Sequence, residues 1–554
     1  MERTILDNTV NDGATLARVE ALVNASDIAA AVEMAQAALA DGMVHPLLLY
    51  LRAYWFSEQG RDAEASNDLK EAIRLAPQDA NIYNTYGQIL VKLQKPLEAA
   101  AAFENAISLA PEFSQAHCNL GCVREGLGEI EAAEQCFKES VRTDPKAAPA
   151  WAKLAGLASR RGEYAQAHVL ADRALSIDPK LHLATQMHAT AAIAEGDLAR
   201  AEALLLGTIL NDPSLSPVDR AVADCSLGDL RHAQGRYDEA YAAYSRRASE
   251  QYAIYAPVFE PPGRETSFSY GVWLADYFEK VEAADWSVKK RRRSLPPDAR
   301  DGAVGHVFLV GFPRSGTTLI ENILASHPGI VALEERETLY DATVAFLSDV
   351  EGRSRLEQIT PKQIEEHRAL YWRNVRRYGA EVEGKIFVDR YPLNSMKLPI
   401  LARLFPDARI LFLIRDPRDV VLSCFRRMFS MNSSTFEFLS LERTARFYDV
   451  VMRLREVYRQ KLEMDWQDLR LEDLVKDFEG SARATCAFIG IDWDSRMQDF
   501  SEIAKTRRIG TPSATQVIRG LNREGIGVWR NYQAHMAGTF PTLAHWIEKF
   551  GYAE

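Results

Sequence analysis

Two spacings of apolar residues divide the chain. Up to about residue 250, apolar residues follow the spacing of amphipathic helices. After residue 300, short unbroken apolar runs appear instead, among them residues 307–310 and 410–414. Their length and their β-branched residues are typical of strands buried in a parallel sheet. The pattern therefore predicts a helical first half and an α/β second half.

The first half also repeats with a fixed period. Five prolines stand 34 residues apart: Pro77, Pro111, Pro145, Pro179 and Pro213. Twelve residues before each proline stands an alanine: Ala65, Ala99, Ala133, Ala167 and Ala201. Seventeen residues before each proline stand Gly60, Gln94, Gly128, Gly162 and Gly196. Alanine lets two helices approach, glycine allows a turn with positive φ, and proline ends the second helix.

This repeat resembles the tetratricopeptide repeat, a helix–turn–helix unit of the same period. The resemblance covers residues 12–250, with a degenerate first unit at 15–40 and a sixth unit whose turn spans 234–240. It implies a helical solenoid over residues 1–250, with a concave face that binds a peptide or a partner protein.

The composition narrows the classes of protein and partner. The chain has 554 residues, too many for one core, and is 47% apolar and 26% charged, as in globular proteins. Its net charge of −11 argues against a nucleic-acid or membrane-surface partner. Six cysteines without a C-x-x-C pair, the lack of a signal peptide at the start and the lack of an apolar run of about 20 residues predict a cytoplasmic protein with reduced thiols.

Residues 251–300 form a predicted connector between the two halves. A proline-bearing stretch from Pro257 to Pro262 interrupts the helical pattern, and the aromatic-rich residues 268–286 are predicted to be helical. Residues 289–293 are a run of lysine and arginine, which we interpret as a solvated surface. A docking site for an acidic substrate segment is the alternative.

The first apolar run leads into a loop with the pattern of a phosphate cradle. The strand predicted at 307–310 is followed by Gly311-Phe-Pro-Arg-Ser-Gly316, and helical spacing begins at Thr317. Such a loop directs backbone N–H groups and the positive end of a helix dipole to one point, where an anion binds. The alternative is an ordinary strand–turn–helix whose glycines serve only the turn.

The loop keeps the spacing of the nucleoside-triphosphate loop G-x-x-x-x-G-K-[ST] but lacks its lysine, because Thr317 stands there. That lysine neutralises the β- and γ-phosphates of a triphosphate. Arg314 lies inside the loop instead. We therefore interpret the loop as a site for a different phosphate-like group.

Two further arginines, Arg390 and Arg415, each follow a predicted strand. In open α/β sheets ligands lie at the carboxyl ends of the strands, where Arg314 also falls. Three arginines at one crevice imply an anionic ligand between them, because their mutual repulsion is otherwise unopposed. A surface ion pair with Asp416 or Asp419 is the alternative for Arg415.

At these residues the second half resembles a known family. Pro313-Arg-Ser-Gly-Thr-Thr-Leu319 and Arg415-Asp-Pro-Arg-Asp-Val-Val-Leu-Ser423 resemble the two nucleotide motifs of sulfotransferases that use 3′-phosphoadenosine 5′-phosphosulfate. Glu334-Glu335 resembles the region that supplies the base in tyrosylprotein sulfotransferases. The resemblance spans residues 300–552. It implies, over residues 301–554, a P-loop-like three-layer α/β domain with a central parallel sheet.

The resemblance implies a role for each motif. The 5′-phosphosulfate of the donor is held by the loop and the start of its helix: Pro313, Arg314, Ser315, Gly316, Thr317 and Thr318. Arg415 and Ser423 hold its 3′-phosphate, and Ser513 lies near the donor. Glu335 takes the proton of the acceptor hydroxyl, while Arg314 and Arg390 stabilise charge on the sulfonyl group. No metal is needed, because arginines oppose that charge.

Several positions leave the assignment open. The family often has a lysine where Arg390 stands, a tyrosine where Leu471 stands and a basic residue where Val528 stands. Glu334 and Glu337 compete with Glu335 as the base. One of three arginines near the C-terminus contacts the nucleotide: Arg519, Arg523 or Arg530.

Three functions compete. The first is a sulfotransferase that acts on a hydroxyl, of a peptide tyrosine or a sugar, with repeats that bind the substrate or a partner. The second is a nucleotide kinase or NTPase with a variant loop, against which the missing lysine weighs. The third is a catalytically impaired adaptor, which the departures at Leu471 and Val528 favour.

Overall fold

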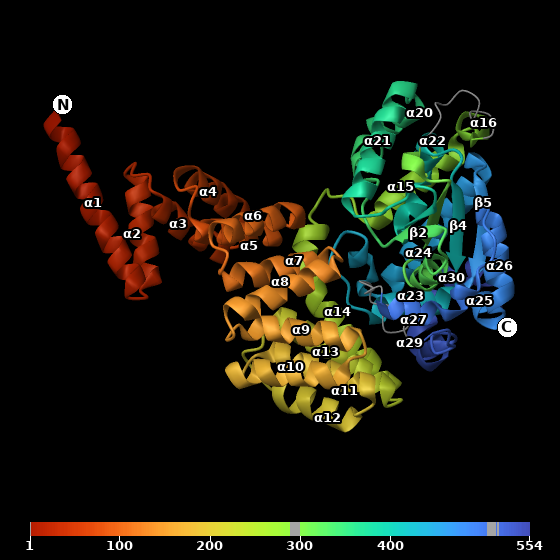
Figure 1. Ribbon diagram of the computed structural model, residues 1–554, viewed down its shortest axis with the longest axis horizontal. Helices are drawn as coiled ribbons and strands as arrows, with labels where there is room; N and C mark the ends of the chain where they lie inside the picture. Colours follow the sequence, from red (N-terminus) through yellow and green to blue (C-terminus); the bar gives the residue numbers. More distant parts are fainter. Residues whose placement is uncertain (1, 289–299, 507–516, 518–519, 554) are drawn as a thin grey trace. The chain divides into compact units, whose positions relative to one another are not determined.

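The structure is a computed structural model that describes residues 2–288, 300–506, 517 and 520–553 (Figure 1). By its internal contacts the chain divides into two compact units: Met1–Leu157 with Ala165–Ala184, and Ala158–Tyr164 with Thr185–Glu554. The domain boundaries expected at residues 250 and 300 stay a prediction, because they follow sequence similarity and not contacts.

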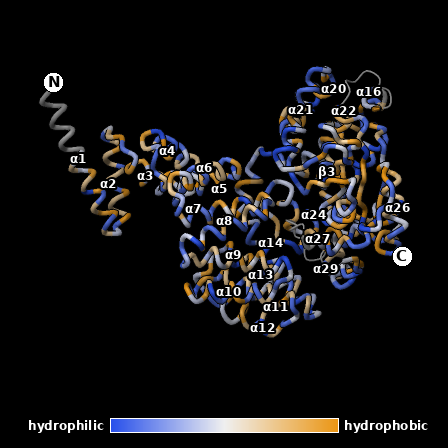
Figure 2. The backbone as a smooth tube through the Cα atoms, viewed as in Figure 1, coloured by the Kyte–Doolittle hydropathy of each residue, from blue (hydrophilic) through white to orange (hydrophobic). Residues whose placement is uncertain are grey.

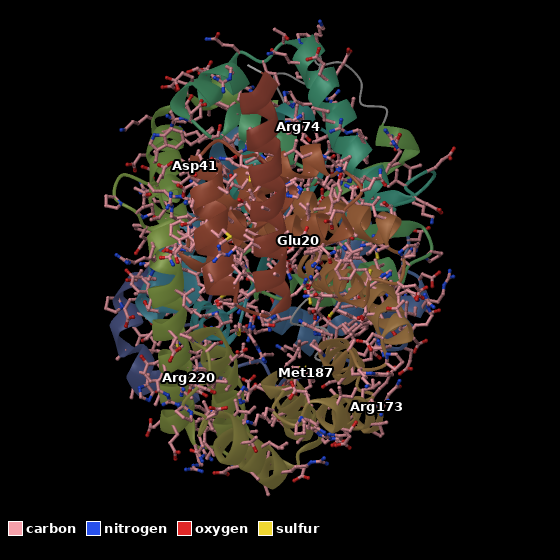
Figure 3. All side chains as sticks on the ribbon, turned by 90° about the vertical axis from the view of Figure 1, so that its left-hand side faces the viewer. Glu20, Asp41, Arg74, Arg173, Met187 and Arg220 are labelled. Atoms are coloured by element: carbon pink, nitrogen blue, oxygen red, sulfur yellow. The ribbon has the colours of Figure 1, made fainter. Side chains whose placement is uncertain are left out.

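The first unit is a series of paired helices. These are α1 (Glu2–Asn24), α2 (Ile28–Ala40), α3 (Pro46–Glu58), α4 (Asp62–Leu75), α5 (Ala80–Lys92), α6 (Pro96–Leu109), α7 (Ser114–Gly126), α8 (Ile130–Thr143), α9 (Ala148–Arg160) and α10 (Tyr164–Ile177). Charged side chains such as Glu20, Asp41 and Arg74 lie exposed on them (Figure 3). Along α2 to α10 hydrophobic and hydrophilic residues are interspersed, as in amphipathic helices (Figure 2).

The landmarks of the repeat have the predicted geometry. The five alanines twelve residues before each proline are at most 1% exposed. The five turn positions adopt left-handed backbone conformations, with φ between 59° and 87°. Four of them are glycine, and Gln94 takes the same conformation without the freedom of glycine. The predicted helix–turn–helix units are therefore confirmed.

The second unit begins with further helices of the same kind. They are α11 (His182–Glu195), α12 (Leu198–Leu204), the π-helical turn η1 (Leu205–Ile209), α13 (Pro217–Ala233) and α14 (Tyr237–Phe259). In α13, Gly228 faces the ring of Tyr244 on α14 so closely that a Cβ atom would overlap it. Two hairpins of the first unit show the same contact, between Gly87 and Phe103 and between Gly121 and Phe137.

A five-stranded parallel sheet forms the centre of the second unit (Figure 1). Its strands are β1 (Gly305–Gly311), β2 (Ile330–Leu333), β3 (Ile386–Arg390), β4 (Arg409–Ile414) and β5 (Asp465–Arg470), in the order β2-β3-β1-β4-β5. Each of the four neighbouring pairs is parallel. All carboxyl ends therefore meet at one edge.

Helices cover both faces of this sheet. They include α15 (Ser267–Lys280), α16 (Ala283–Trp286), α18 (Thr317–Ala325), α19 (Tyr340–Phe346), α20 (Val350–Glu357), α21 (Pro361–Arg377), α22 (Leu398–Leu404), α23 (Pro417–Arg426), α24 (Leu441–Leu462), α25 (Leu471–Lys476), α26 (Phe478–Ile489), α27 (Phe500–Thr506), α29 (Gln533–Met536) and α30 (Phe540–Lys549). Alternate residues of β1 enter two separate cores: Phe308 and Val310 in one, Val307 and Leu309 in the other. The predicted three-layer α/β fold is therefore confirmed. Among the described helices, none is long and apolar enough to cross a membrane.

Candidate functional site

The predicted phosphate loop lies at the carboxyl edge of the sheet. β1 ends at Gly311, and α18 begins at Thr317 with Gly316 as its N-cap residue. Gly316 has a φ of 104°, and a Cβ atom there would lie 2.9 Å from Leu471. Arg314 is held at a φ of 72°, a conformation that is rare for residues other than glycine. The loop is therefore tightly constrained, and the first N–H groups of α18 lie at its end.

Arg314 and Arg415, two of the three arginines predicted to meet, lie together with Ser423. Arg314 Nε donates to Ser423 Oγ over 3.1 Å, and Arg415 Nη1 donates to the carbonyl oxygen of Arg314 over 2.8 Å. Burial, followed by the positive charges of Arg427 and Arg415, lowers the pKa of the Arg314 guanidinium to about 9. Positive charge thus accumulates where the loop ends.

Arg415 is buried at this point, with only 8% of its surface exposed. It also donates to the carbonyl oxygen of Gly525, and its Nε has no hydrogen-bond partner among the described residues. Asp416 pairs with Arg418 instead, at 2.8 Å, and Asp419 accepts from backbone N–H groups of residues 527 and 529. The ion pair considered as an alternative for Arg415 is therefore not formed with Asp416. The charge of Arg415 does act on buried Asp419, because burial raises the pKa of Asp419 and Arg415 opposes that rise.

One cation of this cluster is missing from the sequence prediction. Arg427 follows the last residue of α23 and lies four residues after Ser423. Its charge acts on Arg314, and its Nη1 lies 3.3 Å from Asp229 Oδ2 on α13. The signal that could have found it is the spacing of four residues from Ser423, which places both residues on one side of the helix end.

Arg390 is completely buried between two glutamates. Its Nε donates to Glu321 Oε2 and its Nη1 to Glu335 Oε1, both over 2.6 Å, while Nη2 has no partner among the described residues. Burial opposes the charge of Arg390, but Glu321 and Glu335 outweigh burial and raise its pKa above the ordinary value. Arg390 is therefore a fixed cation whose Nη2 amino group has no acceptor among the residues that the structure describes.

Glu335 is the member of the acidic segment that contacts Arg390. Its side chain is 42% exposed, so it combines an ionic anchor with access to solvent. Glu337 pairs with Lys397 instead, at 2.9 Å. This contact pattern favours Glu335 over Glu337 as the base, although the catalytic role itself stays a prediction.

A buried hydrogen-bond network supports the segment that carries Glu335. Thr338 and Tyr371 each donate to Asp389 Oδ2 over 2.7 Å, and the hydroxyl of Tyr371 lies 2.8 Å from His306 Nε2. Burial raises the pKa of Asp389 to about 6, against the hydrogen bonds from Tyr371 and Thr338. No pattern in the sequence predicted this network, because its members come from β1, β3, α21 and the segment before α19.

The remaining predicted residues lie in different environments. Ser315, Thr317 and Thr318 are buried at the start of α18, and Pro313 is half-buried. Ser513 and Arg519 lie outside the described residues. Arg523 and Arg530 are exposed, Leu471 packs on Gly316, and Val528 begins the 3₁₀ turn η7 (Val528–Tyr532). Within the described ranges, no group of three or more His, Cys, Asp or Glu residues could hold a metal ion.

Comparison with family models matches both halves of the chain. Residues 306–495 match the model of the sulfotransferase family. Residues 84–147 and 118–182 match the model of the tetratricopeptide repeat. A solved tetratricopeptide repeat protein from Parabacteroides merdae is similar to 44% of this chain and 93% of its own, with 20% identity and a TM-score of 0.36.

Individual relatives match in part. An uncharacterized protein of Aquifex aeolicus is 23% identical over 251 residues, which cover 44% of this chain and 33% of that protein. Protein-tyrosine sulfotransferase 2 of Gallus gallus is 25% identical over 242 residues, 40% of this chain and 62% of its own. Omega-hydroxy-beta-dihydromenaquinone-9 sulfotransferase of Mycobacterium bovis is 26% identical over 145 residues, 24% of this chain and 36% of its own. The chain thus spans less than two thirds of each of these relatives. A region similar to tetratricopeptide repeats thus precedes a region that matches the sulfotransferase family model.

Proposed function

We propose that this protein is a sulfotransferase that moves the sulfonyl group of 3′-phosphoadenosine 5′-phosphosulfate to an acceptor hydroxyl. The cluster of Arg314, Arg415 and Ser423 beside a loop without the triphosphate lysine carries the proposal. Arg415 is buried there and its Nε has no hydrogen-bond partner among the described residues, which suits an anion with phosphate groups at two separate points. The match of residues 306–495 to the sulfotransferase family supports it.

The residues of the cluster take distinct parts in this reaction. The loop, with Arg314 and the start of α18, holds the 5′-phosphosulfate, and Arg415, Ser423 and Arg427 hold the 3′-phosphate. Ser513 and one of the C-terminal arginines remain proposed contacts of the donor. As a co-substrate, the donor leaves the site as 3′,5′-adenosine bisphosphate.

The transfer needs one base and one fixed cation. Glu335 accepts the proton of the acceptor hydroxyl while that oxygen forms a bond to sulfur and the bond from sulfur to the 5′-phosphate oxygen breaks. Arg390, held by Glu321 and Glu335, directs its Nη2 group to the charge that develops on the sulfonyl oxygens. Arginine in place of the usual lysine keeps this charge fixed, because its guanidinium has several donors in one plane. The proposed transfer requires no metal.

Two acceptors fit the relatives, a peptide tyrosine and a hydroxyl of a smaller molecule. The name of the Gallus gallus relative refers to a protein tyrosine and that of the Mycobacterium bovis relative to a modified menaquinone. The repeats favour a peptide or protein acceptor, because solenoids of this kind offer an extended surface. Reaction of labelled donor with a cell extract, followed by identification of the labelled molecule, tests this choice.

All six cysteines are free of disulfide bonds, which supports the proposed cytoplasmic location.

The sharpest test compares two nucleotides. We expect 3′,5′-adenosine bisphosphate to bind without a metal and more tightly than ATP, as measured by calorimetry. Tighter binding of ATP that depends on magnesium would support the kinase or NTPase and refute the sulfotransferase. Tight binding of the bisphosphate without transfer to any acceptor would instead support the impaired adaptor.

A further inference from the structure

The last repeat hairpin, α13 with α14, contacts the end of the helix that carries Ser423. Arg247 on α14 is 1% exposed, and its Nη1 donates to the carbonyl oxygen of Arg427 over 2.9 Å. Its Nη2 donates to the carbonyl oxygen of Phe425. Carbonyl groups at the end of a helix lack partners within the helix. Arg247 therefore supplies the C-terminal cap of α23 from another part of the chain.

The same hairpin also holds the side chain of Arg427. Asp229 on α13 accepts from the hydroxyl of Tyr244 over 2.7 Å through Oδ1. Its other oxygen, Oδ2, lies 3.3 Å from Arg427 Nη1, and Arg426 Nη2 lies 3.9 Å from Oδ1. Tyr244 thus fixes the carboxylate, and the carboxylate fixes Arg427.

These contacts are not those of simple packing. A charged side chain that is 1% exposed costs free energy unless its hydrogen bonds are satisfied, and an apolar side chain could fill the same space. The carbonyl oxygens that Arg247 contacts belong to the segment from Ser423 to Arg427. Ser423 accepts a hydrogen bond from Arg314, and the charge of Arg427 acts on Arg314. The hairpin therefore acts on the cation cluster itself.

We propose that α13 and α14 are a working part of the donor site, in which Arg247 and Asp229 are positioning residues that hold Arg427 for the 3′-phosphate of the donor. The inference rests on the proposed function, because it assigns that phosphate to the cluster. Arg247 sets the backbone of Arg427 and Asp229 sets its guanidinium. The last repeat is then required for donor binding, independently of what the other repeats bind.

The test measures binding of 3′,5′-adenosine bisphosphate to full-length variants, well below their melting temperatures. Arg247→Met should weaken binding by about tenfold, because Arg427 would no longer be held in place for its charge-assisted contact with the 3′-phosphate. Arg247→Lys should restore part of the affinity, because lysine keeps a charged donor. The matched control is Arg368→Met, since Arg368 is 5% exposed and donates to the carbonyl oxygen of Leu404 at the end of α22. The control should lower the melting temperature and leave the affinity within about twofold.

A double-mutant cycle separates positioning from general destabilisation. If Arg247 acts through Arg427, Arg247→Met combined with Arg427→Gln should bind no more weakly than Arg427→Gln alone. Additive losses of affinity, or wild-type affinity of Arg247→Met, would overturn the proposal.

If Arg247→Met does not fold, the affinity of Asp229→Asn tests the proposal instead. This substitution keeps the shape of the side chain, and we expect about threefold weaker binding, whereas unchanged affinity overturns the proposal. If the unmodified protein itself fails to bind the bisphosphate, the proposed function is refuted as well.

Discussion

In the repeat helices of the first unit arginines pair with carboxylates in solvent, whereas at the carboxyl edge of the sheet they are buried. Arg61, Arg74 and Arg142 have side chains that are 45–67% exposed, each beside a glutamate three residues away. Arg390 and Arg415 are 0% and 8% exposed. The exposed ion pairs of the repeats contribute little to the free energy of folding, because water screens their charges. The buried arrangement at the sheet edge is costly in free energy unless the charge is paired, as Arg390 is with Glu321 and Glu335.

The two regions also differ in how they use alanine and glycine. In the repeats these residues allow close helix contacts, as at the five buried alanines. At the sheet edge Gly316 gives the loop a left-handed turn, as glycines also do between the repeat helices, and packs against Leu471. The small residue thus lies between helices in the repeats and in the predicted phosphate loop at the sheet edge. Substitutions should therefore change stability in the repeats and binding or turnover at the edge.

The largest expected effect is on turnover. Glu335→Gln keeps an acceptor for Arg390 but cannot take a proton, so kcat should fall on the order of 10²–10⁴-fold, with bisphosphate affinity nearly unchanged. Transfer of labelled sulfonate in single-turnover reactions measures this. Glu337→Gln is the control, because Glu337 pairs with Lys397. A collapse of turnover in the control alone would move the base to Glu337.

Loss of Arg415 should come next, as a loss of donor affinity. Arg415→Gln should weaken binding of 3′,5′-adenosine bisphosphate by about 100-fold, because a buried contact to phosphate is lost. Calorimetry measures the affinity. Arg52→Gln removes an arginine of the repeats, which contacts Asp68 at 2.7 Å, and should leave the affinity unchanged. Equal effects of the two variants would contradict the contrast between the regions.

The sequence predicted more of the structure of the repeats than of the sheet edge. The period of 34 residues predicted the turns and buried alanines of the repeats, since each unit is made of neighbours in the chain. The apolar runs also predicted that Arg314, Arg390 and Arg415 meet, because parallel strands end at one edge. Arg314 and Arg415 are in contact, and Arg390 lies between Glu321 and Glu335. Asp389 and its partners could not be predicted. Their contacts join residues 18 to 65 positions apart, and only the packing of α21 on the sheet brings them together.

Arg427 shows a second limit of the sequence. A basic residue after a helix is common and usually solvated, so the spacing of four residues from Ser423 is by itself too weak a signal to assign Arg427 to the cluster. Its place in the cluster depends on Asp229 and Arg247, which are 198 and 180 positions away. The sequence predicts neighbours within an element reliably, whereas contacts between distant elements depend on the final packing.

Asp389 should give the next largest effect, seen as a pH dependence of stability. Its folded pKa of about 6 lies above its ordinary value of 3.8, so the folded state binds the proton more tightly than the unfolded state. Stability from this group is therefore present below about pH 4 and is lost as the pH rises through 6. Relative to Asp389→Asn, the free energy of unfolding of the unmodified protein should fall by about 2–3 kcal/mol across this window.

Urea unfolding of both proteins between pH 4 and 7 measures the difference. Tyr371→Phe removes a hydrogen bond that lowers the pKa of Asp389, so the window should move to higher pH. Parallel stability curves for Asp389→Asn and the unmodified protein would show that the carboxyl does not titrate in this range.

The smallest expected effects come from one contact that occurs in both units. A Cβ atom at Gly121 would lie 2.6 Å from the ring of Phe137, and one at Gly228 would overlap the ring of Tyr244. Gly121→Ala and Gly228→Ala should each cost about 1–3 kcal/mol of stability, measured by urea unfolding. Gly126→Ala is the control and should not lower stability, because nothing lies within 4 Å of the added Cβ atom and alanine favours the helix more than glycine does.

Only Gly228→Ala should change the affinity of the donor site. Tyr244 donates to Asp229, so a shift of its ring in Gly228→Ala should move that carboxylate and weaken bisphosphate binding by about threefold. Gly121→Ala should leave the affinity unchanged, since Phe137 packs within the repeats of the first unit. Equal affinities of the two variants would mean that the last hairpin stabilises the fold like any other repeat. A difference would separate it from the others as the hairpin on which donor binding depends.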